Sequence, residues 1–208
     1  MPLVAVDGSW ALCMPKKTGS HTIVHYLSPT THCLLGPDFA KVEGEWHGGF
    51  VPDCFHGRRL MITRDSLSRL QSMFRYSIEM REKCFRLADG NFPDFSGWLD
   101  VILRCKWKDD GTIGGAFTCP PTRYDHYQHN LQEYSAHQSE IAKQFQPDEV
   151  FRLEDGIERV FEALGVYVGT PIVRNDTKKD VDVSIPASHQ KRVAEWCERD
   201  AVTMEAAA

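Results

Sequence analysis

Short apolar runs in the first part of the chain alternate with segments of helical periodicity. Residues 10–14 (WALCM) form an apolar run of strand length, which Pro15 ends. Residues 22–27 resume an apolar pattern that fits one or two helical turns. The pattern therefore predicts a strand, a loop over residues 16–20 and a helix. An apolar stretch at residues 3–6 predicts a further strand at the edge of the sheet.

A second strand and helix are predicted after a long loop. Residues 28–57 are rich in Pro, Gly and His and show little periodicity, which is typical of loops. Residues 59–63 (RLMIT) then form a β-type run. The next helix is predicted to extend from residue 64 to about Leu87 with one core-facing stripe. Its apolar residues recur at three- and four-residue spacing, namely Leu67, Leu70, Phe74 and Ile78.

In the second half of the chain, the predicted strands and helices alternate less regularly. Residues 88–121 contain several Gly and Pro turns around one short apolar element, helical or extended, at residues 98–107. Residues 122–145 are polar and lack Gly and Pro, which predicts a helix. Three further elements are predicted: a strand over residues 149–153, a helix that contains Val160 and ends at Gly165, and a helix over about residues 186–202.

This alternation of strands and helices predicts an α/β fold, with a parallel β-sheet flanked by helices in three layers. A length of 208 residues, of which 42% are hydrophobic, suits one sizeable core better than two full domains, so a single domain over residues 1–208 is expected. Loops at the carboxyl ends of parallel strands gather at one edge of the sheet. The loop at residues 16–20 and the residues after position 63 are therefore expected to meet.

Composition excludes several classes of protein. A net charge of −5 and a pI near 6.0 argue against a nucleic-acid partner or a polybasic membrane binder. No apolar run is long enough to span a bilayer, and no basic and apolar leader is visible. A soluble cytoplasmic chain, or a soluble domain of a longer targeted protein, is expected. Seven cysteines without a Cys-x-x-Cys pair predict mostly reduced thiols.

The loop at residues 16–20 (KKTGS) is the first candidate site. A glycine-containing loop between a strand and a helix brings free backbone N–H groups and the positive helix end together, which favours an anion such as phosphate. The P-loop pattern of nucleotide-binding proteins needs two glycines five positions apart, followed by Lys and then Ser or Thr. Here both lysines precede the only glycine, so the loop is not of that type.

The segment Lys17-Thr18-Gly19-Ser20 after an apolar strand resembles the 5′-phosphosulfate loop of sulfotransferases that use 3′-phosphoadenosine-5′-phosphosulfate (PAPS). The second signature of that family is a strand ending in Arg-Asp-Pro, followed on the next helix by Arg, Ser and an aromatic residue. Ser66 stands here where proline is usual. Six other residues lie at matching spacings: Arg64, Asp65, Arg69, Ser72, Phe74 and Tyr76. Two signatures in the right order are more specific than either one.

The resemblance implies the P-loop-like sulfotransferase fold, with PAPS as the donor and no metal. It implies that Lys17 acts in catalysis at the leaving oxygen, and that Arg64 and Ser72 bind the 3′-phosphate. His21 stands where the family usually has Thr or Ser, and Lys16 where it has Pro, so the register of the two lysines stays open. The residues implied to bind the 5′-phosphosulfate are Lys16, Lys17, Thr18, Gly19, Ser20, His21 and Thr22.

A candidate base lies between the two signatures. Trp46-His47-Gly48 resembles the first half of an aromatic-His-Gly-His stretch in relatives that sulfate uronic acid or hexose hydroxyls, a group that includes the uronyl 2-O-sulfotransferases. Gly49 replaces the second histidine. His47 is therefore the implied catalytic base, with Glu45 or Glu43 in reserve, and a surface or capping role for His47 is equally compatible. The implied acceptor is a small molecule or a glycan, bound on the side of the loop-rich residues 28–57 and 88–121.

Two alternatives from other classes stay open. A nucleotide or phosphate kinase fits poorly, because the Walker lysine position and a clear magnesium carboxylate are missing. A non-catalytic nucleotide-binding protein on the same scaffold is compatible with the missing second histidine. Zinc is not expected, because His126 and His129 with Cys119 lack a second close pair of ligands.

Overall fold

The computed structural model divides the chain into two compact units. The first unit comprises residues 1–65, 138–176 and 202–208, and the second comprises residues 66–137 and 177–201. Units of this kind also form within one domain, so the single domain stays a prediction. The structure describes residues 2–5, 7–27, 31–33, 55–80, 85, 87, 91–107, 117–118, 134–166 and 181–202.

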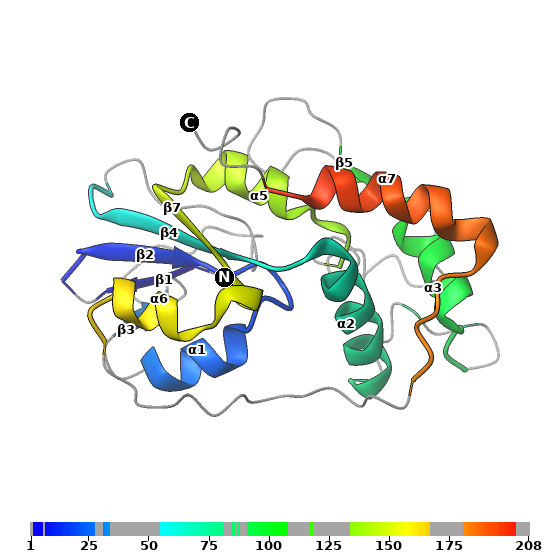
Figure 1. Ribbon diagram of the computed structural model, residues 1–208, viewed down its shortest axis with the longest axis horizontal. Helices are drawn as coiled ribbons and strands as arrows, with labels where there is room; N and C mark the ends of the chain where they lie inside the picture. Colours follow the sequence, from blue (N-terminus) through cyan, green and yellow to red (C-terminus); the bar gives the residue numbers. More distant parts are fainter. Residues whose placement is uncertain are drawn as a thin grey trace. The chain divides into compact units, whose positions relative to one another are not determined.

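The first unit is built on a five-stranded sheet with the strand order β3-β1-β2-β4-β7 (Figure 1). β2 pairs with β4 and β4 with β7 in parallel, whereas β1 pairs antiparallel with β2 and with β3. The strands are β1 (Pro2–Ala5), β2 (Trp10–Cys13), β3 (Thr31–Cys33), β4 (Arg58–Thr63) and β7 (Glu149–Arg152).

β1 departs from the predicted parallel sheet, because it runs antiparallel to both neighbours, and it is not the predicted edge strand, because β3 lies outside it. The chain passes from β1 to β2 through a tight turn in which Gly8 has a φ of 72° and its N–H donates to Ala5. Such a short connection can join only antiparallel neighbours, because a parallel pair needs a crossover of a dozen or more residues. The α/β class itself is confirmed, and the parallel part of the sheet is β2, β4 and β7.

Helices cover both faces of this sheet (Figure 1). α1 (Ser20–Leu27) and α6 (Glu158–Ala163) lie on one face, and α5 (Gln138–Phe145) lies on the other. The shared core of the first face contains Leu12 and Leu60 from the sheet together with residues of both helices, Ile23, Leu27, Val160 and Phe161. The first unit is therefore a three-layer arrangement.

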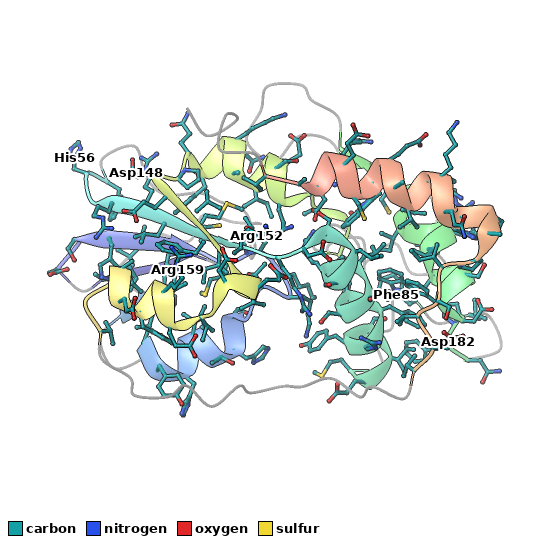
Figure 2. The ribbon with its side chains drawn as sticks, in the orientation of Figure 1. His56, Phe85, Asp148, Arg152, Arg159 and Asp182 are labelled. Atoms are coloured by element: carbon teal, nitrogen blue, oxygen red, sulfur yellow. The ribbon has the colours of Figure 1, made fainter. Side chains whose placement is uncertain are left out.

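The second unit is mainly helical. α2 (Ser66–Glu79), α3 (Phe95–Ile102) and α7 (Gln190–Asp200) contribute to an aromatic core, and α7 follows a 3₁₀ turn at Ala187–His189. Phe85, labelled in Figure 2, has its ring centroid 5.7 Å from that of Trp98 and 5.0 Å from that of Tyr134. β5 (Lys106–Trp107) and β6 (Phe117–Thr118) form a separate antiparallel pair.

Two predicted helices end or begin elsewhere. α2 ends at Glu79 instead of Leu87, and Met80, the residue directly after it, is exposed. The helix predicted over residues 122–145 is interrupted in the described part: Tyr134 and Ser135 are helical, residues 136 and 137 are not, and α5 begins at Gln138. Residues 122–133 lie outside the described part. Ala136 is not helical, because its carbonyl accepts a hydrogen bond from the buried Arg69 guanidinium instead.

Candidate functional site

The loop between β2 and α1 is held by hydrogen bonds within itself. Both the backbone N–H and the hydroxyl of Thr18 donate to the Pro15 carbonyl, at 3.2 and 2.7 Å. Thr18 is fully buried, so its side chain stabilises the loop and has no donor left for a ligand. Lys17 has a φ of 70°, a left-handed conformation that costs a residue with a Cβ about 1–2 kcal/mol.

Three backbone N–H groups at the start of α1 have no hydrogen-bond acceptor among the described residues. The N–H groups of Thr22 and Ile23 bind the Gly19 carbonyl at 3.1 and 3.2 Å. The N–H groups of Gly19, Ser20 and His21 make no hydrogen bond with any residue that the structure describes. Open N–H groups at the positive end of a helix form an anion-binding site.

Both the backbone conformation at position 19 and the little space beside it favour glycine. Its φ is 87°, and a Cβ at this position would lie 3.1 Å from Cδ1 of Leu153 and 3.5 Å from Cδ1 of Ile157. Leu153 begins the 3₁₀ turn η3 (Leu153–Asp155), which follows β7 directly. The residues after β7 and before α6 therefore lie close against the loop at Gly19.

Arg64 joins the second predicted segment to this loop. It follows directly after β4, and its Nη1 donates to the Lys17 carbonyl at 3.2 Å. The two segments therefore meet at the carboxyl edge of the parallel strands, as the sequence predicts. Their part in binding a ligand stays a prediction.

The other predicted loop residues differ in their exposure. Lys16, Lys17 and Ser20 are half-buried, His21 is exposed and Thr22 is buried. Cys13, which ends β2 before the loop, is fully buried, and burial raises the pKa of its thiol to about 11. This cysteine is therefore not a nucleophile at neutral pH.

Several predicted residues lie elsewhere. Ser72 is buried on α2 in the second unit. Arg69, which matched the second signature, is also buried there and is paired with Asp200, so it is structural rather than solvated. His47 and the reserve candidates Glu43 and Glu45 lie outside the described residues.

Three polar residues near the loop were missed in the sequence. Gln138 and Glu154 bind the backbone of residues 64 and 65, and Arg152 ends β7 opposite Thr63 in the parallel register. The only signal for Arg152 and Glu154 is that they follow the apolar part of a strand. Gln138 gives no signal, because a glutamine at the start of a polar helix is ordinary.

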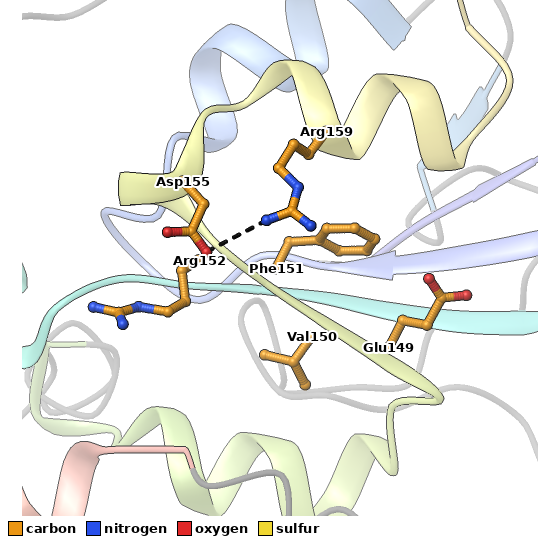
Figure 3. A pocket seen from close by; sticks show the side chains of 6 residues that line it. All are labelled: Glu149, Val150, Phe151, Arg152, Asp155 and Arg159. Carbon is orange, nitrogen blue, oxygen red and sulfur yellow. Dashed lines mark ion pairs between the residues drawn. The ribbon is translucent and has the colours of Figure 1, made fainter.

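A shallow pocket lies along β7 (Figure 3). Asp155 and Arg159 at its rim form an ion pair of 3.6 Å, and Arg152 points away from that pair. Its volume is about 220 Å³, below the range of about 300–1,000 Å³ that is usual for ligand pockets. The lining residues are Glu149, Val150, Phe151, Arg152, Asp155 and Arg159.

The described segments contain no group of three or more His, Cys, Asp or Glu side chains that could hold a metal ion. Among these segments, no helix has the length and apolar character needed to cross a bilayer. Cys13 is a free thiol.

Known proteins do not supply a family for this arrangement. The candidate site is therefore defined by its own geometry, a strand, a loop with open N–H groups and a neighbouring arginine. Comparisons of the chain with protein-family models, with curated proteins and with solved structures give no match.

Proposed function

We propose that this chain is a sulfotransferase that moves a sulfuryl group from PAPS to an acceptor hydroxyl. One observation carries the proposal: the Arg64 guanidinium, which follows β4, contacts the same short loop that presents the open N–H groups at the start of α1, through the 3.2 Å hydrogen bond to the Lys17 carbonyl. PAPS carries two separate anionic groups. A donor row and a neighbouring arginine suit such a ligand better than they suit a single phosphate.

The protein's part in the reaction is mainly to position reactants and to neutralise charge. The acceptor oxygen forms a bond to sulfur as the bond between sulfur and the phosphate oxygen breaks. The electron pair of the broken bond remains on that phosphate oxygen, where the Lys17 ammonium and the loop N–H groups stabilise the negative charge. The acceptor proton passes to a base, for which we propose His47, a role worth about 10²–10⁴-fold in rate.

The finer parts of the proposal rest on the resemblance in sequence. Arg64 and Ser72 are assigned to the 3′-phosphate, in a sulfotransferase fold of the P-loop-like kind. The acceptor is assigned to the carbohydrates, because Trp46-His47-Gly48 is most similar to relatives that modify sugars.

Calorimetric titration with adenosine 3′,5′-bisphosphate, the product form of the donor, tests the proposal. Adenosine 5′-phosphate and ATP serve as controls, since each lacks the 3′-phosphate. We expect the bisphosphate to bind at least about tenfold more tightly, which corresponds to about 1.4 kcal/mol. The preference should be lost in Arg64→Ala, and Lys17→Ala should weaken binding of all three nucleotides. Equal binding of the three by the unaltered protein would refute the proposal.

A non-catalytic nucleotide-binding protein is the second candidate. It is favoured by Gly49, which stands where the carbohydrate-modifying relatives have a second histidine. The sulfotransferase and the non-catalytic protein should both prefer the bisphosphate, so only a measurement of turnover distinguishes them. Transfer of ³⁵S from labelled PAPS to a panel of glycans and phenols, lowered at least about 100-fold in His47→Ala with bisphosphate affinity kept, would identify the enzyme.

A further inference from the structure

The backbone of residues 64 and 65 continues beyond the end of β4 and is bound there by side chains. The Gln138 carboxamide binds both backbone polar groups of Arg64. Its Oε1 accepts a hydrogen bond from the Arg64 N–H at 2.8 Å, and its Nε2 donates to the Arg64 carbonyl at 2.8 Å. Gln138 begins α5 and is only 1% exposed. One carboxamide therefore fixes both backbone polar groups of Arg64 and, with them, the direction in which its side chain leaves the chain.

Asp65, the residue after Arg64, is bound by a second side chain. The Asp65 N–H donates to Oε1 of Glu154 at 2.9 Å. Glu154 lies on η3 next to Leu153, which contacts the position of Gly19 in the loop. The same short turn therefore supports the loop at residues 16–20 and the backbone after β4. The contact of Arg64 Nη1 with the Lys17 carbonyl joins the two supported segments.

We propose that Gln138 and Glu154 are positioning residues, which hold the backbone of Arg64 and Asp65 so that the Arg64 guanidinium meets the 3′-phosphate of the nucleotide. This inference rests on the proposed function. Neither residue needs to touch the ligand. In metal sites, residues that orient a metal ligand contribute about 10–100-fold in affinity. Gln138 orients Arg64 in a similar way, through two hydrogen bonds to its backbone.

The test measures selectivity between nucleotides rather than stability. Gln138→Leu removes both hydrogen bonds to Arg64 with nearly the same side-chain volume. We expect it to weaken binding of adenosine 3′,5′-bisphosphate by about tenfold and to leave adenosine 5′-phosphate within about twofold. A purely structural role would weaken both nucleotides together. Gln144→Leu is the matched control, because Gln144 lies exposed on the same helix.

Glu154 offers a test by conservative replacement. Glu154→Gln keeps an oxygen that can accept from the Asp65 N–H, so the preference for the bisphosphate should be retained. Glu154→Ala removes the acceptor and should lower the preference. Glu158→Ala, at an exposed position on α6, is the matched control. These variants also carry the test if Gln138→Leu does not fold.

A double-mutant cycle identifies the route of the effect. If Gln138 acts through Arg64, Gln138→Leu should change bisphosphate affinity by less than about twofold in an Arg64→Ala background. A full effect in that background would overturn the inference. So would an unchanged nucleotide preference in both Gln138→Leu and Glu154→Ala, and this outcome would leave the proposed function standing. Absence of any preference in the unaltered protein would overturn both.

Discussion

At the residue scale, the left-handed backbone at Lys17 and Gly19 defines the candidate site. A residue with a Cβ rarely adopts such a φ, and one that does so is held by its surroundings. Here Thr18, with two hydrogen bonds to one carbonyl, holds Lys17. Backbone segments that combine right- and left-handed residues form nests of successive N–H groups, which bind anions.

Gly19→Ala tests this geometry. We expect it to lower the free energy of unfolding by about 2 kcal/mol, because the left-handed φ costs about 1–2 kcal/mol and the new Cβ crowds Leu153. Binding of adenosine 3′,5′-bisphosphate should weaken in parallel. Gly165→Ala is the control, because Gly165 also has a positive φ, 68°, but no atom of the described residues lies within 4 Å of a Cβ there. Urea unfolding and calorimetry measure both effects, and an equal cost in the two variants would contradict the crowding at Leu153.

At the element scale, a buried ion pair fastens α7 to α2 within the second unit. Nη1 of Arg69 donates to Oδ1 of Asp200 at 2.6 Å, and both side chains are 0% exposed. Burial lowers the pKa of Arg69, whereas the Asp200 carboxylate acts in the opposite direction. Nη2 of Arg69 binds the Ala136 carbonyl at 2.8 Å. The arginine of the second signature therefore connects three segments of the core.

Asp200→Ala should destabilise the protein by about 3–5 kcal/mol, because it leaves the Arg69 charge buried without its partner. The comparison variant is Glu195→Ala on the same helix, which removes an exposed pair with Lys191 at 3.9 Å. That pair is worth at most about 0.5 kcal/mol. Urea unfolding curves give both values. A loss below about 1 kcal/mol in Asp200→Ala would show that the helices are held by apolar packing alone.

At the scale of the whole molecule, stability should depend on pH through a buried histidine. His137 is 5% exposed, its Nδ1 lies 3.8 Å from Oδ1 of Asp200 without a hydrogen bond, and its ring packs against Trp196. Burial lowers its pKa to about 4. Asp200 opposes this shift, and Arg199 and Arg69 add to it. Its normal value is about 6.5.

Between pH 6.5 and 4 the unfolded chain binds a proton at His137 that the native protein does not bind. The free energy of unfolding should therefore fall as the pH is lowered through this window, by up to about 3 kcal/mol from this group. Urea unfolding at several pH values measures the slope, which should be smaller in His137→Asn. His56→Asn, at an exposed position labelled in Figure 2, should keep the slope of the unaltered protein. An identical slope in all three proteins would assign the pH dependence to other groups.

The sequence alone determined where β2, β4 and β7 lie and which loop follows β2. These features depend on local patterns, because an apolar run of strand length bounded by Pro or Gly has few other conformations open to it. The position of Gly19 is determined in the same way, since a left-handed turn before a helix favours glycine.

Only the tertiary structure decided the direction of β1, the burial of Arg69 and the support of Arg64. Gln138 is 74 residues from Arg64 in sequence, and Glu154 is 89 residues from Asp65. The periodicity of the sequence does not indicate which distant polar groups will form contacts, because those contacts depend on how the packed helices and strands bring chain segments together. Local pattern thus predicted the loop and its arginine, and packing selected the residues that hold them in place.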